Sequence, residues 1–502
     1  MNRVRMERGV SSEPRGGRVW PARWRPGSAG SRVTAWALVL AAVLTAGIGP
    51  AVTEAAAQSP MTGAPLAEAP PLISRVLDNG LEVIVLEDPS VPLVTVEMAV
   101  RTGSFTEPPE LNGLSHLYEH MFFKPAPRAP GRETYIHLLD QLGIVSNGRT
   151  LEEVVEYYFT TTSPNFPLAM RWLRDGILYP EFDPVELSRE IEVVVGELDR
   201  HESSPFDAFL KEVNNRLFYR YPSRKNPAGN RETVRSATPE IMRMIQSRYY
   251  VPNNSALIVA GDVVAEEVFD LVEELLGDWQ PRARDPFEEF PLVEHPPLER
   301  SEAAILTTNV QNVTVQIAWQ GPSIGVDDEA TYAADVFMFI LRQPNSRFQR
   351  ALVDSGLTLG VSFGYYTQRN VGPIYLTFQT TPDRARAALR AVYEEISHFN
   401  DPDYFTDEEL ESAKALLEAD DLFSREEVSD YVHTIAFWWS TTGLDYFRGY
   451  LRNLRATSRE DISRYISTYI QGQPHVALAL LSPQSLAVSG LTEADLIGEV
   501  QQ

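Results

Sequence analysis

The sequence predicts an α+β protein of two similar domains, each a sheet with helices packed mainly on one face. Strand-like segments are interspersed with helical apolar periods from residue 71 to 280, and a comparable order begins again at residue 300. Between them, residues 281–299 combine several prolines with charges and show no apolar period, which is typical of a linker. We therefore expect the fold to occupy residues 71–280 and 300–490, with helices layered on each sheet.

Each domain is expected to begin with strands. In the first domain, strands are expected at residues 81–86, 91–100, 154–161 and 255–260, and helices at 114–123, 135–142, 167–178, 191–200, 206–218, 239–249 and 266–276. In the second domain, strands are expected at 304–308, 313–319, 372–380 and 475–481, and helices at 330–341, 384–399 and 407–419. The closing strand at 475–481 echoes the one at 255–260.

The N-terminal residues 1–57 predict an export signal that is not part of the fold. Eight arginines precede the apolar run at residues 33–48, and Ala55-Ala56-Ala57 offers a small-residue cleavage site. The apolar run is close to the shortest that spans a bilayer, so an uncleaved membrane anchor is the alternative. We expect a periplasmic or secreted protein with a flexible leader at residues 58–70.

The composition restricts the kinds of partner and site. The chain has no cysteine, which excludes disulfides and thiolate metal ligands. Its net charge of −25 becomes −30 without residues 1–57, because that segment holds eight arginines and three acidic residues. So acidic a body argues against nucleic acid as a partner. It suits basic peptides, although solubility alone also accounts for the charge.

The helix expected at residues 114–123 carries a candidate metal site. Its apolar stripe consists of Leu114, Leu117, Tyr118 and Met121. On the other side, His116 and His120 are four residues apart, so both imidazoles can reach one zinc ion. Glu119 lies beside them and can act on water as a general base without binding the metal. The alternative for this His-x-x-Glu-His pattern is a solvated helix face.

Glu197 is the candidate for the third ligand. Asp183 and Pro184 are suited to begin a helix, and along that helix Glu190 and Glu197 share a face because they are two turns apart. One carboxylate can complete a His, His, Glu site and leave a fourth position for water. The other can hold a ligand in place. The alternative is again an exposed acidic face.

Residues 113–124 resemble the metal helix of the pitrilysin and insulin-degrading enzyme family, most closely its processing-peptidase branch. Residues 77–81 and 250–262 resemble the opening and closing strands of that family's first domain. The resemblance is strong from residue 71 to 279 and weaker beyond. It implies processing-peptidase-like domains with mostly antiparallel sheets, and one zinc per chain. It also implies Glu197 as third ligand and Glu190 as the acid that supports the site.

The resemblance also implies a substrate-binding strand. Asn147 and Thr150 match a segment that lies on an edge strand beside the zinc and pairs with substrate, while Gly148 departs from the family's alanine. Asn147 is therefore the expected substrate-binding residue, since a sheet edge binds extended peptides through the backbone. Considered without the resemblance, Asn147-Gly148 also fits an ordinary turn.

The second domain departs from active relatives, which carry an Arg and a Tyr that bind substrate. Those two positions are Leu352 and Leu359 here, and a leucine side chain donates no hydrogen bond. Tyr365, Tyr366 or Arg369 are candidates to replace them. Otherwise a homologous subunit supplies the Arg and Tyr in a heterodimer, and a self-sufficient homodimer is the alternative.

We expect a zinc metalloendopeptidase that hydrolyses extended peptides, with zinc-activated water and Glu119 as general base. The alternative is a non-catalytic assembly or scaffolding subunit of a processing-peptidase-like complex. The second domain shows no metal motif, and we expect structural or surface roles for His398, His433 and His475. The aromatic run at residues 437–439 is expected in a core.

Overall fold

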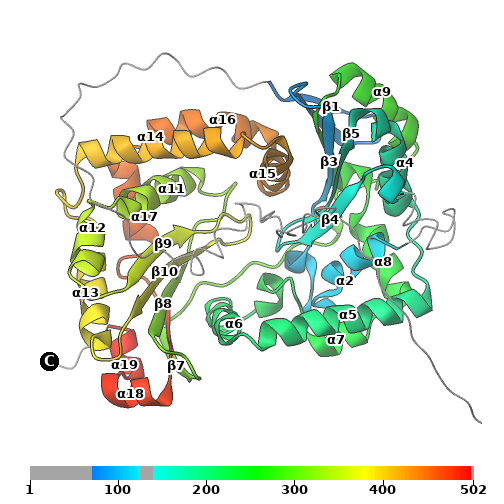
Figure 1. Cartoon of the computed structure of the whole chain (residues 1–502). Coiled ribbons are helices and arrows are strands. Elements are labelled where there is room, and N and C mark those ends of the chain that lie inside the picture. The colour runs from blue at the N-terminus through cyan, green and yellow to red at the C-terminus, as the bar shows by residue number, and fades with distance from the viewer. Residues whose placement is uncertain (1–70, 125–138, 499–502) are drawn as a thin grey trace, which may run out of the picture. The chain divides into compact units, whose positions relative to one another are not determined.

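The computed structural model describes residues 71–124 and 139–498, and contains two sheets with helices (Figure 1). The expected export signal and leader, and most of the helix expected at 135–142, lie outside the described residues. No helix in the described part of the chain is long and apolar enough to cross a membrane.

Among the described residues, the first sheet has six strands in the order β1-β2-β6-β3-β5-β4; β2 and β6 pair in parallel and the other neighbours pair antiparallel. The strands are β1 (Ile73–Val76), β2 (Glu82–Glu87), β3 (Leu93–Val100), β4 (Val145–Thr150), β5 (Val155–Thr162) and β6 (Ser255–Gly261). The helices of this half are α2 (Leu114–Phe122), α4 (Phe166–Leu178), α5 (Pro184–Glu202), α6 (Pro205–Leu217), α7 (Arg231–Arg235), α8 (Pro239–Tyr249), α9 (Ala265–Leu276) and α10 (Pro286–Glu289).

The second sheet repeats this plan without a counterpart of β1. Its order is β7-β11-β8-β10-β9, in which only β7 and β11 pair in parallel. The strands are β7 (Glu302–Thr307), β8 (Val313–Gln320), β9 (Gly360–Tyr365), β10 (Pro373–Thr380) and β11 (Val476–Leu481). The helices are α11 (Asp328–Arg342), α12 (Arg347–Gln349), α13 (Ala385–His398), α14 (Asp407–Ser424), α15 (Val428–Thr441), α16 (Leu444–Ala456), α17 (Arg459–Tyr469), α18 (Pro483–Ser489) and α19 (Glu493–Leu496). The predicted α+β fold of two similar, mostly antiparallel sheets is confirmed.

One face of each sheet carries a large core. In the first half, the inward residues of β2, β3 and β6 pack against α2, α4, α5 and α9, and in the second half those of β8 and β10 pack against α11 and α13. The apolar stripe expected on α2 is buried in the first of these cores. Burial of this kind is the main source of stability for such layers, at roughly 25 cal/mol per Å² of apolar surface.

The other face of each sheet is covered by a helix from the opposite half of the sequence. Helix α15 packs on the first sheet through residues that include Val432, Ile435 and Trp439. Helix α6 packs on the second sheet through Phe209 and Val213. The expectation of helices mainly on one face is therefore incomplete, because each half lends one helix to the second face of the other half's sheet.

The segment expected as a linker differs from that expectation. The expected linker at 281–299 contains α10 and the buried His295, so it is packed against the protein.

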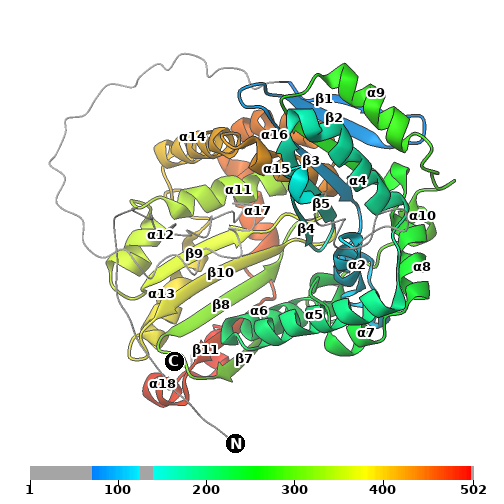
Figure 2. The same cartoon turned by 45° about the vertical axis from the view of Figure 1, so that its right-hand side comes forward.

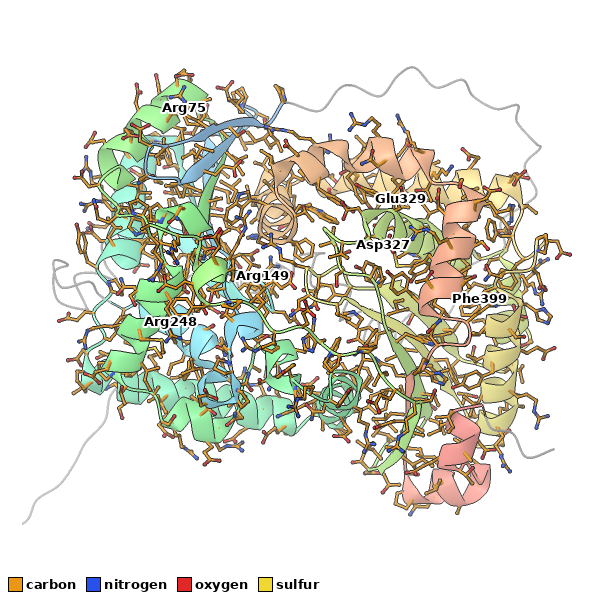
Figure 3. All side chains as sticks on the ribbon, turned by 180° about the vertical axis from the view of Figure 1, so that it is seen from behind. Arg75, Arg149, Arg248, Asp327, Glu329 and Phe399 are labelled. Atoms are coloured by element: carbon orange, nitrogen blue, oxygen red, sulfur yellow. The ribbon has the colours of Figure 1, made fainter. Side chains whose placement is uncertain are left out.

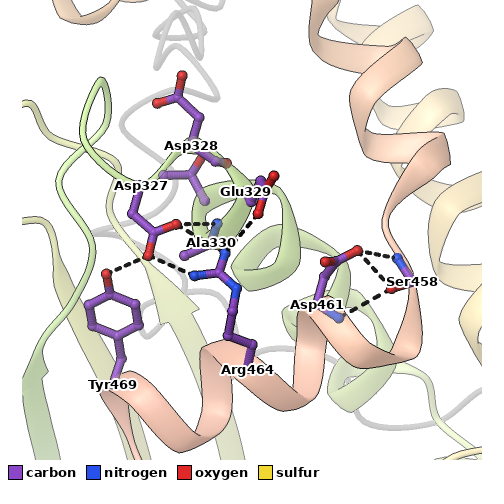
Figure 4. A network of polar contacts seen from close by, with 9 residues as sticks. Asp327, Asp328, Glu329, Ala330, Ser458, Asp461, Arg464 and Tyr469 are labelled. Atoms are coloured by element: carbon purple, nitrogen blue, oxygen red, sulfur yellow. Dashed lines mark hydrogen bonds and ion pairs between the residues drawn. The ribbon is translucent and has the colours of Figure 1, made fainter.

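Helix α11 follows β8 in the second half as α2 follows β3 in the first half. Asp327 caps the start of α11. That carboxylate accepts hydrogen bonds from Ala330 N, Arg464 and Tyr469, the last two on α17 (Figure 4).

Replacing Trp439 by alanine is expected to loosen the first sheet, although Trp439 belongs to the second half of the sequence. Its indole N–H donates to Glu82 Oε2 on β2 at 2.8 Å, and the Arg101 guanidinium lies 4.0 Å from its ring centre. The loss should be about 3–5 kcal/mol of unfolding free energy. Hydrogen exchange should accelerate in β2, β3 and β6.

The matched control is Trp319→Ala, which removes an equally buried indole from β8. This variant should accelerate exchange in the second sheet instead. Equal acceleration in both sheets for both variants would contradict the assignment of α15 to the first sheet.

Candidate metal centre and active site

The metal-binding candidates on α2 depend on how that helix begins. Gly113 precedes the helix with a φ of 95°, which favours glycine, and a β-carbon there would lie 2.8 Å from Gly229 Cα. Glu107 then caps the helix, because its carboxylate accepts the backbone N–H groups of Gly113 at 2.7 Å and Ser115 at 2.6 Å. Burial raises the pKa of Glu107 to about 7. Sequence reasoning missed this residue, since it lies outside the helix.

Three side chains converge between α2 and α5, two helices that lie side by side in both views (Figures 1 and 2). His116 Nε2 and His120 Nε2 are 3.3 Å apart. Glu197 Oε2 on α5 lies 3.6 Å from the first nitrogen and 3.5 Å from the second. The structure therefore brings together the three ligands expected from the sequence.

The triangle formed by these atoms is suited to a zinc ion. A point at its centre is about 2.0 Å from each corner, which is the usual length of zinc bonds to imidazole and carboxylate. Burial, followed by the neighbouring His120, lowers the pKa of His116 to about 4, so its imidazole is neutral and available as a ligand.

Glu190 lies two turns before Glu197 on α5 and contacts His120. Its Oε2 lies 3.4 Å from His120 Nδ1, the ring nitrogen that faces away from the triangle, and its other oxygen pairs with Lys124. Burial alone would lower the pKa of His120, but the bond with Glu190 and the nearby carboxylates raise it. A carboxylate in this position can orient the imidazole ring, which is the role predicted for Glu190.

Glu119 stands apart from the three candidate ligands and contacts strand β4. Its side chain is only 8% exposed, and its Oε2 accepts a hydrogen bond from Thr150 Oγ1 at 2.8 Å. Burial raises the pKa of Glu119 to about 7, and the hydrogen bond from Thr150 opposes that change. The structure thus places a carboxylate beside the candidate ligands and outside their triangle.

Strand β4 is the outermost strand beside the site, as the family resemblance implied. Asn147 and Gly148 lie within this strand and pair with β5, so the interpretation as an ordinary turn is wrong. Alternate residues of a strand face opposite sides. Gly148 and Thr150 face Glu119, whereas the side chain of Asn147 lies on the other face, with its Oδ1 3.0 Å from Gly148 N.

Two family models match the chain. The model described as Insulinase (Peptidase family M16) matches residues 82–228, and the model described as Peptidase M16 inactive domain matches residues 236–417. Together the matches span well over half of the sequence. The chain belongs to peptidase family M16.

Relatives of this M16 chain are named zinc proteases. The uncharacterized zinc protease YmxG of Bacillus subtilis is 25% identical over 70% of this chain and 84% of its own length. The zinc protease PqqE of Helicobacter pylori is 23% identical over 79% of this chain and 90% of its own. Among solved structures, a protease from Helicobacter pylori aligns with a TM-score of 0.74 at 21% identity, covering 82% of this chain and 99% of that one. This last likeness concerns the fold.

The candidates for replacing the Arg and Tyr are engaged elsewhere in the M16 chain. Tyr365 donates to Pro322 O at 2.9 Å, and Tyr366 donates to Glu152 Oε2 at 3.3 Å. Arg369 Nε donates to Thr441 O at 3.2 Å. All three groups are thus bonded to residues outside the candidate metal centre.

Leu352 and Leu359, the positions where the family resemblance implies an Arg and a Tyr, differ in their surroundings. Leu352 is fully buried in the second core, while Leu359 is about half exposed. Neither supplies a polar group.

A second polar cluster lies under α15 on the far face of the first sheet. His433 pairs with Glu97 of β3, and Arg149 of β4, labelled in Figure 3, pairs with Glu156 of β5 at 2.5 Å. All four side chains are largely buried. The carboxylates and the imidazole could hold a cation, but the Arg149 guanidinium already supplies positive charge there. The expected structural role of His433 fits this pairing.

Replacing Glu190 by glutamine is expected to weaken zinc binding about 10- to 100-fold while the fold is kept, because His120 loses a charged partner. Competition with a fluorescent zinc chelator measures the affinity. Glu192→Gln on the exposed side of α5 is the matched control and should bind zinc as the wild type does. Equal affinities for both variants would contradict the supporting role.

Proposed function

We propose that this M16 protein is a zinc-dependent endopeptidase that hydrolyses extended peptides. The observation that carries the proposal is the convergence of His116, His120 and Glu197 beside a buried carboxylate and an open sheet edge. These are the three elements that metal-assisted peptide hydrolysis uses: a Lewis acid site, a base and a place for the backbone of the substrate. The zinc protease names of the relatives support it.

The chemistry follows from the roles of the side chains. Zinc bound by the three ligands would polarise the scissile carbonyl and activate water. Glu119 accepts the proton of that water at its carboxylate and delivers a proton to the departing amine. Glu190 keeps the ring of His120 oriented. Strand β4 pairs with the extended substrate beside Glu119, so selection rests more on backbone than on side chains.

A non-catalytic subunit is the second candidate function. The observation that favours it is the pair Leu352 and Leu359, which leaves the second half without the Arg and Tyr of active relatives. Against it, His116, His120 and Glu197 could hold a metal ion together and the Glu119 carboxylate lies outside their triangle, which supports the peptidase. The peptidase therefore explains more of the structure.

The absence of the Arg and Tyr at Leu352 and Leu359 supports a partner subunit that supplies these two residues. We extend the proposal to a heterodimer with a homologous subunit that carries those two residues, because an active hydrolase needs groups that stabilise the oxyanion. Export by the segment at residues 1–57 is part of the same proposal.

Glu119→Gln should keep zinc and lose about 10²–10⁴-fold in kcat, because the amide cannot accept the proton. Zinc content by mass spectrometry and cleavage of a quenched fluorescent peptide measure the two effects. Loss of zinc in this variant, or cleavage at the wild-type rate, would refute the assigned role.

The purified single chain should cleave peptides feebly, and addition of the homologous subunit should raise kcat by about 10²–10³-fold, the usual worth of an oxyanion donor. A partner in which its Arg and Tyr are replaced by leucine is the control and should give no increase. Full activity of the single chain would favour the homodimer and exclude the heterodimer.

A further inference from the structure

We infer that Gly148 and Thr150 of β4 form a seat that positions the carboxylate of Glu119 for proton transfer. This inference rests on the proposed function and adds two positioning residues to it. It assigns the edge strand a role beyond pairing with substrate, since the same strand would hold the base.

The hydroxyl of Thr150 is one side of the seat. Its Oγ1 donates to Glu119 Oε2 at 2.8 Å, and both side chains are at least partly shielded from water. A hydrogen bond to a carboxylate is stronger and more directional than one between neutral groups. It therefore selects one orientation of the carboxylate.

Gly148 is the second residue of the seat, because the Glu119 carboxylate occupies the space that a side chain at this position would fill. A β-carbon at this position would lie 2.6 Å from Glu119 Oε1 and 2.9 Å from its carboxyl carbon. Both are closer than non-bonded atoms approach, so a side chain at this position requires the Glu119 carboxylate to shift from where this structure places it. The backbone of Gly148 has a negative φ within an ordinary strand, so no turn requires glycine here, and the close contact of this position is with Glu119.

The strand itself is held firmly on its other side. Arg149, between the two seat residues, points to the opposite face and pairs with the buried Glu156. Directly after β4, Leu151 N donates to Val154 O in the tight turn that leads into β5. The seat is thus fixed by the far-face ion pair and by the turn, as positioning at a catalytic centre requires.

The test compares Thr150→Val, Thr150→Ser and Gly148→Ala in the zinc-loaded full chain, with its partner subunit present if the single chain is feeble. Thr150→Val replaces the hydroxyl by a methyl group of similar size and should lower kcat about 10- to 100-fold with KM and zinc content nearly unchanged. Thr150→Ser should restore most of the activity. Gly148→Ala should lower kcat by displacing the carboxylate although the hydroxyl is kept.

The matched control is Thr160→Val. Thr160 lies on β5 and shares a hydrogen bond of 2.8 Å with Thr95, so this variant loses a comparable bond away from Glu119. It should keep the wild-type kcat. A change of KM alone in the Thr150 variants would indicate a role in substrate pairing and overturn the inference, as would a failure of serine to restore kcat.

A second measurement is independent of activity. Crystal structures of metal-free Thr150→Val and Gly148→Ala should show the Glu119 carboxylate moved from its place against β4, and Thr160→Val should show it in place. An unmoved carboxylate in both seat variants overturns the inference even if the protein proves to have no peptidase activity. A wild type that binds zinc but cleaves no peptide with its partner, in combination with a moved carboxylate, would refute only the proposed function.

Discussion

The packing of α5 against α2 is the constraint on which the candidate site depends. Two imidazoles on successive turns of one helix come together through local geometry alone. The third candidate ligand, Glu197, belongs to a helix more than seventy residues later in the sequence, so its position depends on how the two helices pack. The apolar stripes of both helices share one core, so the burial that stabilises the first half also sets the position of Glu197. The start of α2 completes this arrangement, because Glu107 and Gly113 fix where the helix begins.

The sequence predicted the residues of the site whose relation is local or periodic. The spacing of His116 and His120 requires only a helix, and Glu190 and Glu197 required a helix and the family resemblance. Glu107 was missed because it reaches α2 across a loop. The relation of Thr150 to Glu119 was missed because it depends on how β4 lies against α2, which no spacing encodes. Asn147 was placed on the correct edge strand, but its side chain faces away from Glu119.

The fold was likewise predictable in its class and in most of its elements, but not in how the two halves exchange helices. The alternation of strands and helices was sufficient for the α+β fold and for the repeat, and most expected elements lie within a few residues of those observed. Strands β1 and β9 and the helices α15, α16 and α17 were not expected, and neither were the short helices α7, α10, α12, α18 and α19. The exchange of α6 and α15 between the halves could not be predicted either, because an amphipathic helix shows that it covers a surface and not which one. In the same way, Glu97, Glu156 and His433 are brought together by tertiary structure alone.

The most direct test of the proposed zinc centre is a crystal structure of the zinc-loaded chain with anomalous diffraction at the zinc edge. One strong peak per chain is expected between His116, His120 and Glu197, with bonds of about 2.0–2.2 Å and the Glu119 carboxylate outside the ligand set. A zinc peak at Glu97, Glu156 and His433 instead, or no peak in protein that is correctly folded, would contradict it.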